Sequence, residues 1–206
     1  MLCGAAVWLG ACGGETPPAR GPEAAAHGMS GVSSGTEVER FFPLVDGNVY
    51  HYATESDAGQ PGLLVVWVFR NDAGRGELRY ARGSRRFEYA ADGVRVAGGG
   101  AYVLKLPLTM GASWPGEHGG TTRVIAVDAV AAVPAGQFTG CVQTLEERRG
   151  DQPARWATTF CPDTGIVLLE VASGANLERA ELKSYGRPVV LGPDGLEKTP
   201  VAPQSP

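Results

Sequence analysis

The chain has 206 residues, a formal net charge of −4 and 19% charged residues, with acidic and basic side chains scattered along its length. This scatter argues against binding to nucleic acid or to a membrane through a polybasic surface, because both need clustered Lys and Arg. The 30 glycines and 15 prolines, between short runs of Val, Thr and aromatic residues, are typical of strands and turns. A folded part of about 150 residues buries enough surface to need no metal or disulfide for its core.

Residues 1–11 are apolar and uncharged, and they end in Leu9-Gly10-Ala11-Cys12. This tetrapeptide resembles the lipobox of bacterial lipoproteins. The resemblance implies that residues 1–11 are a signal peptide and that Cys12 becomes the N-terminus and carries fatty acyl chains such as palmitate. Gly13 rather than Asp follows Cys12, which by the same resemblance implies the outer membrane. An ordinary cleaved signal peptide is the alternative.

Residues 12–37 are rich in Gly, Pro, Ala and Ser and predict a flexible tether. Within it, residues 31–35 match the G-x-S-x-G pattern of serine hydrolases, but that motif needs a strand before it and a helix after it, and a tether supplies neither. We therefore expect a β-domain over residues 38–186. The proline content of residues 187–206 predicts a disordered tail.

Short apolar or alternating runs between Gly, Pro, Asn and Asp turns predict strands along the β-domain. They cover residues 49–52, 62–70, 77–81, 85–90, 94–97, 102–108, 121–133 and 166–171. Residues 177–185 contain helix-forming side chains, with Asn176 as a possible N-cap. We favour a strand there, because Ala180 and Leu182 alternate with charged residues.

Residues 136–171 contain the most specific structural pattern, a predicted hairpin with its turn centred on Asp151. This register places favourable pairs opposite one another, namely Cys141 with Cys161, Val142 with Phe160, Thr144 with Thr158, and Glu147 with Arg155. If Cys12 carries lipid, Cys3 leaves with the signal peptide, and Cys141 and Cys161 are the two cysteines that remain. An even count in an exported protein predicts a disulfide between them, with a pair of buried thiols as the alternative.

Residues 43–50 and 107–114 share the pattern P-L-x-x-G-x-x-aromatic. We interpret each copy as a strand stopped by Pro, a tight Gly turn and an aromatic residue that returns to the core. Two copies indicate either a duplicated β-unit or a chance match in a chain rich in Gly and Pro. Together with the lipobox and the tether, these motifs resemble bacterial outer-membrane lipoproteins of uncharacterised function. The resemblance implies an envelope location and a β fold, and it brings no catalytic residues.

Residues with catalytic chemistry are few. If the two repeated motifs pack together, His51 and His118 could approach each other near Glu117 and Asp46, although hydrogen-bonded turn histidines are the more usual case. No histidine lies at metal-ligand spacing from a cysteine, so we expect no metal site. The sequence has no phosphate-binding or dinucleotide-binding glycine motif, so we expect no cofactor.

We interpret pairs of adjacent charged residues in the predicted strands as structural or solvated charges and not as parts of a site. Glu146 and Glu147 must point to opposite faces of a strand and cannot form an acid–base pair. The doublets Arg85-Arg86 and Arg148-Arg149 are interpreted as solvated charges at strand ends.

The predicted fold is all-β, a single antiparallel barrel-like or strongly curved sheet of about ten short strands. We expect a non-enzymatic envelope lipoprotein that acts as a binding or assembly module, with the membrane and another envelope protein as partners. The alternative is a carrier of lipid or another apolar ligand, with Trp67, Trp114 and Trp156 as candidate ligand contacts rather than ordinary core residues. A third hypothesis is an envelope hydrolase that uses His51 or His118.

Overall fold

The structure is a computed structural model that describes residues 36–57 and 59–189. The chain divides into two compact units, residues 1–32 and 33–206, and the described residues all belong to the second. The predicted signal peptide, Cys12, almost all of the tether and most of the predicted tail lie outside the described residues. None of the described helices is both long enough and apolar enough to span a bilayer.

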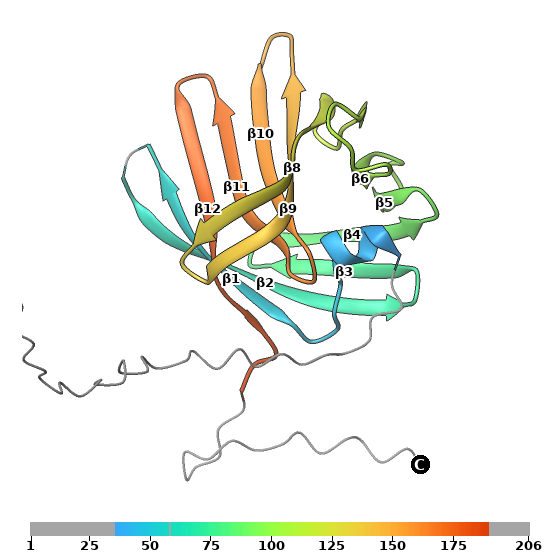
Figure 1. The fold of residues 1–206 in the computed structure, drawn as a ribbon. Helices are drawn as coiled ribbons and strands as arrows, with labels where there is room; N and C mark the ends of the chain where they lie inside the picture. The colour runs from blue at the N-terminus through green and yellow to red at the C-terminus, as the bar shows by residue number, and fades with distance from the viewer. Residues whose placement is uncertain (1–35, 58, 190–206) are drawn as a thin grey trace, which may run out of the picture. The chain divides into compact units, whose positions relative to one another are not determined.

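Twelve antiparallel strands form one nearly closed, barrel-shaped sheet, and a single short helix precedes them (Figure 1). The elements are α1 (Glu37–Phe41), β1 (Val49–Ser56), β2 (Pro61–Asp72), β3 (Arg75–Tyr80), β4 (Gly83–Ala90), β5 (Gly93–Val96), β6 (Tyr102–Lys105), β7 (Ser113–Pro115), β8 (Thr121–Val133), β9 (Gly136–Arg148), β10 (Ala154–Cys161), β11 (Gly165–Ser173) and β12 (Asn176–Gly186). The predicted all-β barrel-like sheet is confirmed, and the ambiguous segment near the C-terminus is the strand β12. The short elements α1 and β7 were not predicted.

The barrel consists of two consecutive six-stranded meanders, β1 to β6 and β7 to β12. Every strand pairs with its neighbours in sequence except β6 and β7, which are the two edges of the sheet. The first strand pairs with the last, and this β1–β12 ladder joins the meanders on the other side. The gap in the barrel wall therefore lies between β6 and β7.

Each meander begins with one copy of the repeated motif, and the two copies have the same local geometry. Gly47 and Gly111 both have a positive φ, +78° and +82°, which glycine adopts without steric cost. The N–H of Gly47 donates to the carbonyl of Val68 at 3.1 Å, and the N–H of Gly111 donates to that of Val124 at 2.9 Å. In return, the N–H of Val68 donates to the carbonyl of Asn48, and the N–H of Val124 donates to that of Ala112, both at 2.9 Å. The aromatic residues that end the two copies, Tyr50 and Trp114, are buried. This equivalence agrees with a duplicated unit, which stays a prediction.

The hairpin register predicted from the sequence is confirmed in the β9–β10 ladder. Its partners include Val142 with Phe160, Thr144 with Thr158, and Glu147 with Arg155. Cys141 and Cys161, the residues next to the Val142–Phe160 pair, form a disulfide and are fully buried.

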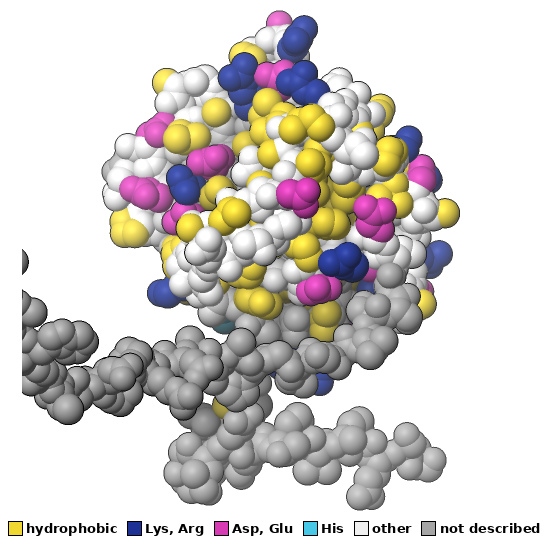
Figure 2. Space-filling model, viewed as in Figure 1, with side chains coloured by type: hydrophobic (Ala, Val, Ile, Leu, Met, Phe, Trp, Pro, Cys, Tyr) yellow, Lys and Arg dark blue, Asp and Glu magenta, His cyan; other side chains and the backbone are white. Residues whose placement is uncertain are grey.

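Alternation along the strands separates the inside of the barrel from its outer face. In β2, Val66 and Val68 are buried, whereas Trp67 and Phe69 are exposed. The helix α1 and the segment that follows it add further buried side chains, among them Phe41 and Phe42. Figure 2 shows apolar side chains gathered in the middle of the face that Figure 1 views, with charged side chains around them.

Candidate functional site

The interior of the barrel contains a mainly apolar cavity of about 300 Å³. Its volume lies at the lower end of the range of about 300–1,000 Å³ that is typical of ligand pockets. Seven strands and two connecting segments contribute side chains to its wall, because each strand presents alternate residues inward. The lining residues are Phe42, Tyr52, Leu64, Val66, Leu78, Tyr80, Arg85, Phe87, Val103, Glu117, Ile166, Leu169 and Ala180.

Phe42, in the segment that follows α1, is buried and lines the cavity. Its ring packs edge-on against Phe87, with the ring centroids 5.1 Å apart. The hydroxyl of Tyr89, near the end of β4, donates to the Phe42 carbonyl at 2.6 Å and accepts the N–H of Leu44 at 3.0 Å. One half-buried phenol therefore holds the segment that carries Phe42.

A second hollow, of about 330 Å³, lies between β1, β2, β11 and β12. It shares Leu64, Leu169 and Ala180 with the inner cavity. Polar side chains at the rim, including Thr54 and Glu178, also line it. The two hollows are therefore separated by a wall that these three side chains form together.

Two tyrosines of β1, Tyr50 and Tyr52, are buried in the interior. Burial raises the pKa of Tyr50 to about 12 and raises that of Tyr52 still further. Desolvation is the main cause for both, because a phenolate loses its hydration in an apolar interior. The Tyr52 hydroxyl donates to the carbonyl of Ile166 at 2.9 Å, which satisfies the polar atom of this cavity residue.

The charged groups in the cavity wall form one ion pair. The guanidinium of Arg85 in β4 binds the carboxylate of Glu117 through two contacts, at 2.6 and 3.3 Å. Glu117 belongs to the β7–β8 loop, residues 116–120, so this pair crosses the gap between the two edge strands. An ionic contact in a mostly apolar pocket can orient the polar end of a ligand.

A buried carboxylate fixes the loop that carries Glu117. Glu146 in β9 is 4% exposed, and its Oε1 accepts the backbone N–H groups of His118 and Gly120, both at 2.9 Å. Its Oε2 lies 2.9 Å from Nδ1 of His118. The imidazole of His118 stacks on Trp156 with the ring centroids 4.2 Å apart and the planes 4° from parallel. We call Glu146, His118 and Trp156 the loop anchor.

The three tryptophans proposed as ligand contacts lie in different environments. Trp67 is 42% exposed on the outer face of β2, and Trp114 is 3% exposed in β7. Trp156 faces the interior as part of the loop anchor. None of the three is among the residues that line the inner cavity, so their role as ligand contacts stays a prediction.

The two candidate histidines have separate partners. His51 lies 3.2 Å from the hydroxyl of Ser184 in β12, whereas His118 contacts Glu146 and lies 3.6 Å from Glu117. In residues 36–57 and 59–189, no group of three or more His, Cys, Asp and Glu side chains is arranged to hold a metal ion. The expected opposition of the adjacent glutamates is confirmed, because Glu146 is buried and Glu147 is partly exposed.

The interpretation of the arginine doublets was incomplete. Arg86 is well exposed, as expected, but Arg85 lines the cavity. Similarly, Arg148 lies over the ring of Trp156, 5.1 Å from its centroid. A signal was available for Arg85, since it precedes Phe87 by two residues and so shares its face of the strand.

No protein-family model and no curated protein matches the sequence. Solved structures that are similar to it at low identity include the following two. A proposed exported protein with a YmcC-like fold from Bacteroides fragilis is 12% identical, with a TM-score of 0.45 over 71% of this chain and 99% of its own. A proposed lipoprotein from Parabacteroides distasonis is 11% identical, with a TM-score of 0.44 over 71% of this chain and 98% of its own.

Proposed function

We propose that the protein is a non-enzymatic lipoprotein of the bacterial envelope that binds an apolar ligand inside its β-barrel. The observation that carries the proposal is the cavity between Phe42 and the Arg85–Glu117 pair, which is apolar over most of its wall. This combination of an apolar lining with a few convergent polar groups is typical of small-molecule sites. A ligand with an acyl chain and one polar end fits that chemistry.

The proposed location depends on the N-terminal sequence. Acylation of Cys12 would attach the protein to a membrane, and the glycine that follows Cys12 favours the outer membrane. The tether would let the barrel reach ligand in the space next to that membrane. The proposed partner is another envelope protein, with which the barrel would exchange its ligand.

The binding test uses the full-length chain with Cys12→Ala, so that the proposed anchor does not contribute. N-phenylnaphthylamine, whose fluorescence rises in an apolar environment, serves as the probe and decanoic acid as its competitor. Ala180→Phe would place a ring in the cavity beside Leu169. Excluding two methylene groups of the ligand, at about 0.8 kcal/mol each, weakens binding about tenfold.

The matched control is Ala157→Phe. Ala157 pairs with Leu145 and Glu170, and it alternates with the inward-facing Trp156, so the new ring lies on the outer face. We expect the control to bind as the parent does. Equal binding by Ala180→Phe and its parent, or no binding by the parent, contradicts the proposal. If Ala180→Phe does not fold, Leu169→Ala replaces it and is expected to alter the preference for ligand length.

A further inference from the structure

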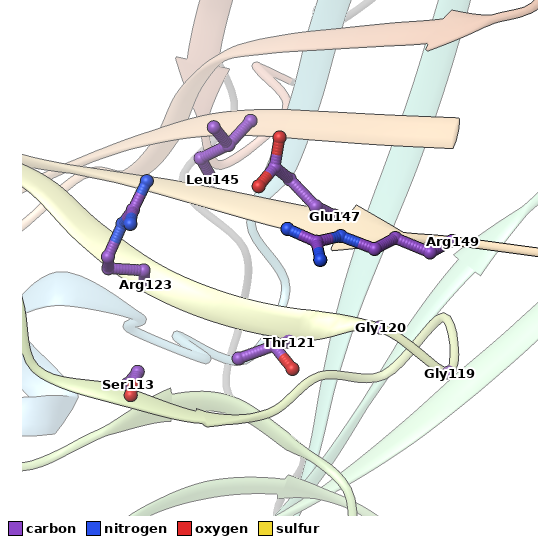
Figure 3. A pocket seen from close by; sticks show the side chains of 8 residues that line it. All are labelled: Ser113, Gly119, Gly120, Thr121, Arg123, Leu145, Glu147 and Arg149. Atoms are coloured by element: carbon purple, nitrogen blue, oxygen red, sulfur yellow. The ribbon is translucent and has the colours of Figure 1, made fainter. Parts of the chain in front are cut away.

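A third hollow, of about 560 Å³, lies over β7, β8 and β9 (Figure 3). We call it the arginine pocket, defined by Ser113, Thr121, Arg123, Glu147 and Arg149 among its lining residues. In Figure 3, Arg123 lies at one end and the side chain of Arg149 extends back from the other end toward the middle. No residue of the arginine pocket lines the barrel cavity.

The strand register explains why these side chains share the outer face. Ser113 pairs with Arg123, and Thr121 pairs with Glu147. The residues between them in each strand, including Thr122 and Glu146, are buried in the barrel. Because side chains alternate between the two faces of a sheet, the residues of the arginine pocket point outward together.

The charges in the arginine pocket are not balanced locally. Within the described part of the chain, no carboxylate lies at ion-pair distance from Arg123 or Arg149. The one acidic residue of the pocket, Glu147, pairs with Arg155 of β10 at 3.1 Å. Two guanidinium groups therefore border a concave surface whose one carboxylate is paired with an arginine outside it.

We propose that the arginine pocket binds a phosphate group, either in the headgroup of an anionic lipid or as free phosphate. Guanidinium groups at two ends of the pocket suit an anion that directs oxygens to more than one side, which phosphate does and a planar carboxylate does less well. The hydroxyls of Ser113 and Thr121 add two hydrogen-bond donors on the same face. The site is separate from the barrel cavity and stands whether or not that cavity binds an apolar ligand.

The test uses the full-length chain with Cys12→Ala and two probes. Calorimetric titration with inorganic phosphate measures binding of the free anion, and acetate serves as the carboxylate comparison. Co-sedimentation with phosphatidylglycerol vesicles, against phosphatidylcholine vesicles, measures binding of the headgroup. The double variant Arg123→Gln/Arg149→Gln is expected to bind at least about tenfold more weakly, since each arginine supplies charge-assisted hydrogen bonds.

Two further variants separate the site from general charge effects. Arg82→Gln removes an exposed arginine in the β3–β4 turn and is expected to leave binding unchanged. Glu147→Gln removes the only negative charge of the arginine pocket and is expected to strengthen binding by up to about fivefold. A gain of this kind cannot arise from misfolding.

The outcomes are distinct. Phosphate binding that depends on the two arginines supports a site for the free anion. Binding only to phosphatidylglycerol vesicles, with the same dependence, supports a headgroup site. Failure to bind either probe, or equal loss in Arg82→Gln and the double variant, overturns the proposal.

Discussion

Replacing the buried carboxylate of the loop anchor tests how the β7–β8 loop is held. Glu146→Ala removes the acceptor for two backbone N–H groups, of His118 and Gly120, and for the ring nitrogen of His118. A buried donor left without a partner costs about 1–3 kcal/mol. With three donors affected and the loop free to admit some water, we expect a loss of about 3 kcal/mol in the free energy of unfolding.

The adjacent residue provides a matched control. Glu147 pairs with Arg155 at the partly exposed outer face, and such pairs contribute up to about 1 kcal/mol. Urea unfolding at neutral pH, with the disulfide intact, measures both variants. A loss of 3 kcal/mol lowers the midpoint by about 1.5 M for a slope of about 2 kcal/mol/M, and Glu147→Ala should lower it by less than about 0.5 M. Equal midpoints for the two variants would refute the proposed anchoring role.

Two further predictions rest on contacts in the barrel, and a third rests on the N-terminal sequence. Tyr89→Phe is expected to destabilise the protein by about 1–3 kcal/mol at neutral pH, because the N–H of Leu44 loses its acceptor. Burial raises the pKa of Tyr89 to about 12 from 10.0, so the folded state holds this proton more tightly than the unfolded state. The proton on Tyr89 therefore contributes to the free energy of unfolding below pH 10, and this contribution is lost as the pH rises toward 12. Urea unfolding between pH 10 and pH 12 should show a smaller fall in the free energy of unfolding for Tyr89→Phe than for the parent. Replacing Cys141 and Cys161 with Ala opens a loop of 20 residues and is expected to cost about 3 kcal/mol; an unchanged urea midpoint would exclude this stabilisation. Cys12→Ala is expected to move the protein from the membrane fraction to the soluble fraction of its host, and continued membrane association would contradict the lipobox interpretation.

The sequence was most informative where one local pattern determined the structure. In the hairpin of β9 and β10, the turn residues and the opposed cysteines defined one register, and a slip by one residue would have separated every favourable pair. The glycines of the repeated motif likewise indicated turns, because a tight turn at Gly47 or Gly111 needs a positive φ.

The site could not be predicted to the same extent, because its contacts join distant parts of the chain. Arg85 and Glu117 are 32 residues apart and meet only because the barrel brings β4 and the β7–β8 loop together. The arginine doublet gave no sign of that partner. The orientation of Trp67 was likewise not readable from the sequence, because a continuous apolar run does not show which side chains face the interior, and Trp67 lies on the outer face.

The proposed ligand in the barrel is tested most directly by the mass of the native protein. Protein purified gently from its host membrane would be weighed under native and under denaturing conditions, beside the Ala180→Phe variant. We expect extra non-covalent mass that disappears on denaturation and is reduced in Ala180→Phe. A native mass equal to the denatured mass, or an extra mass unchanged by filling the cavity, would contradict a ligand at this site.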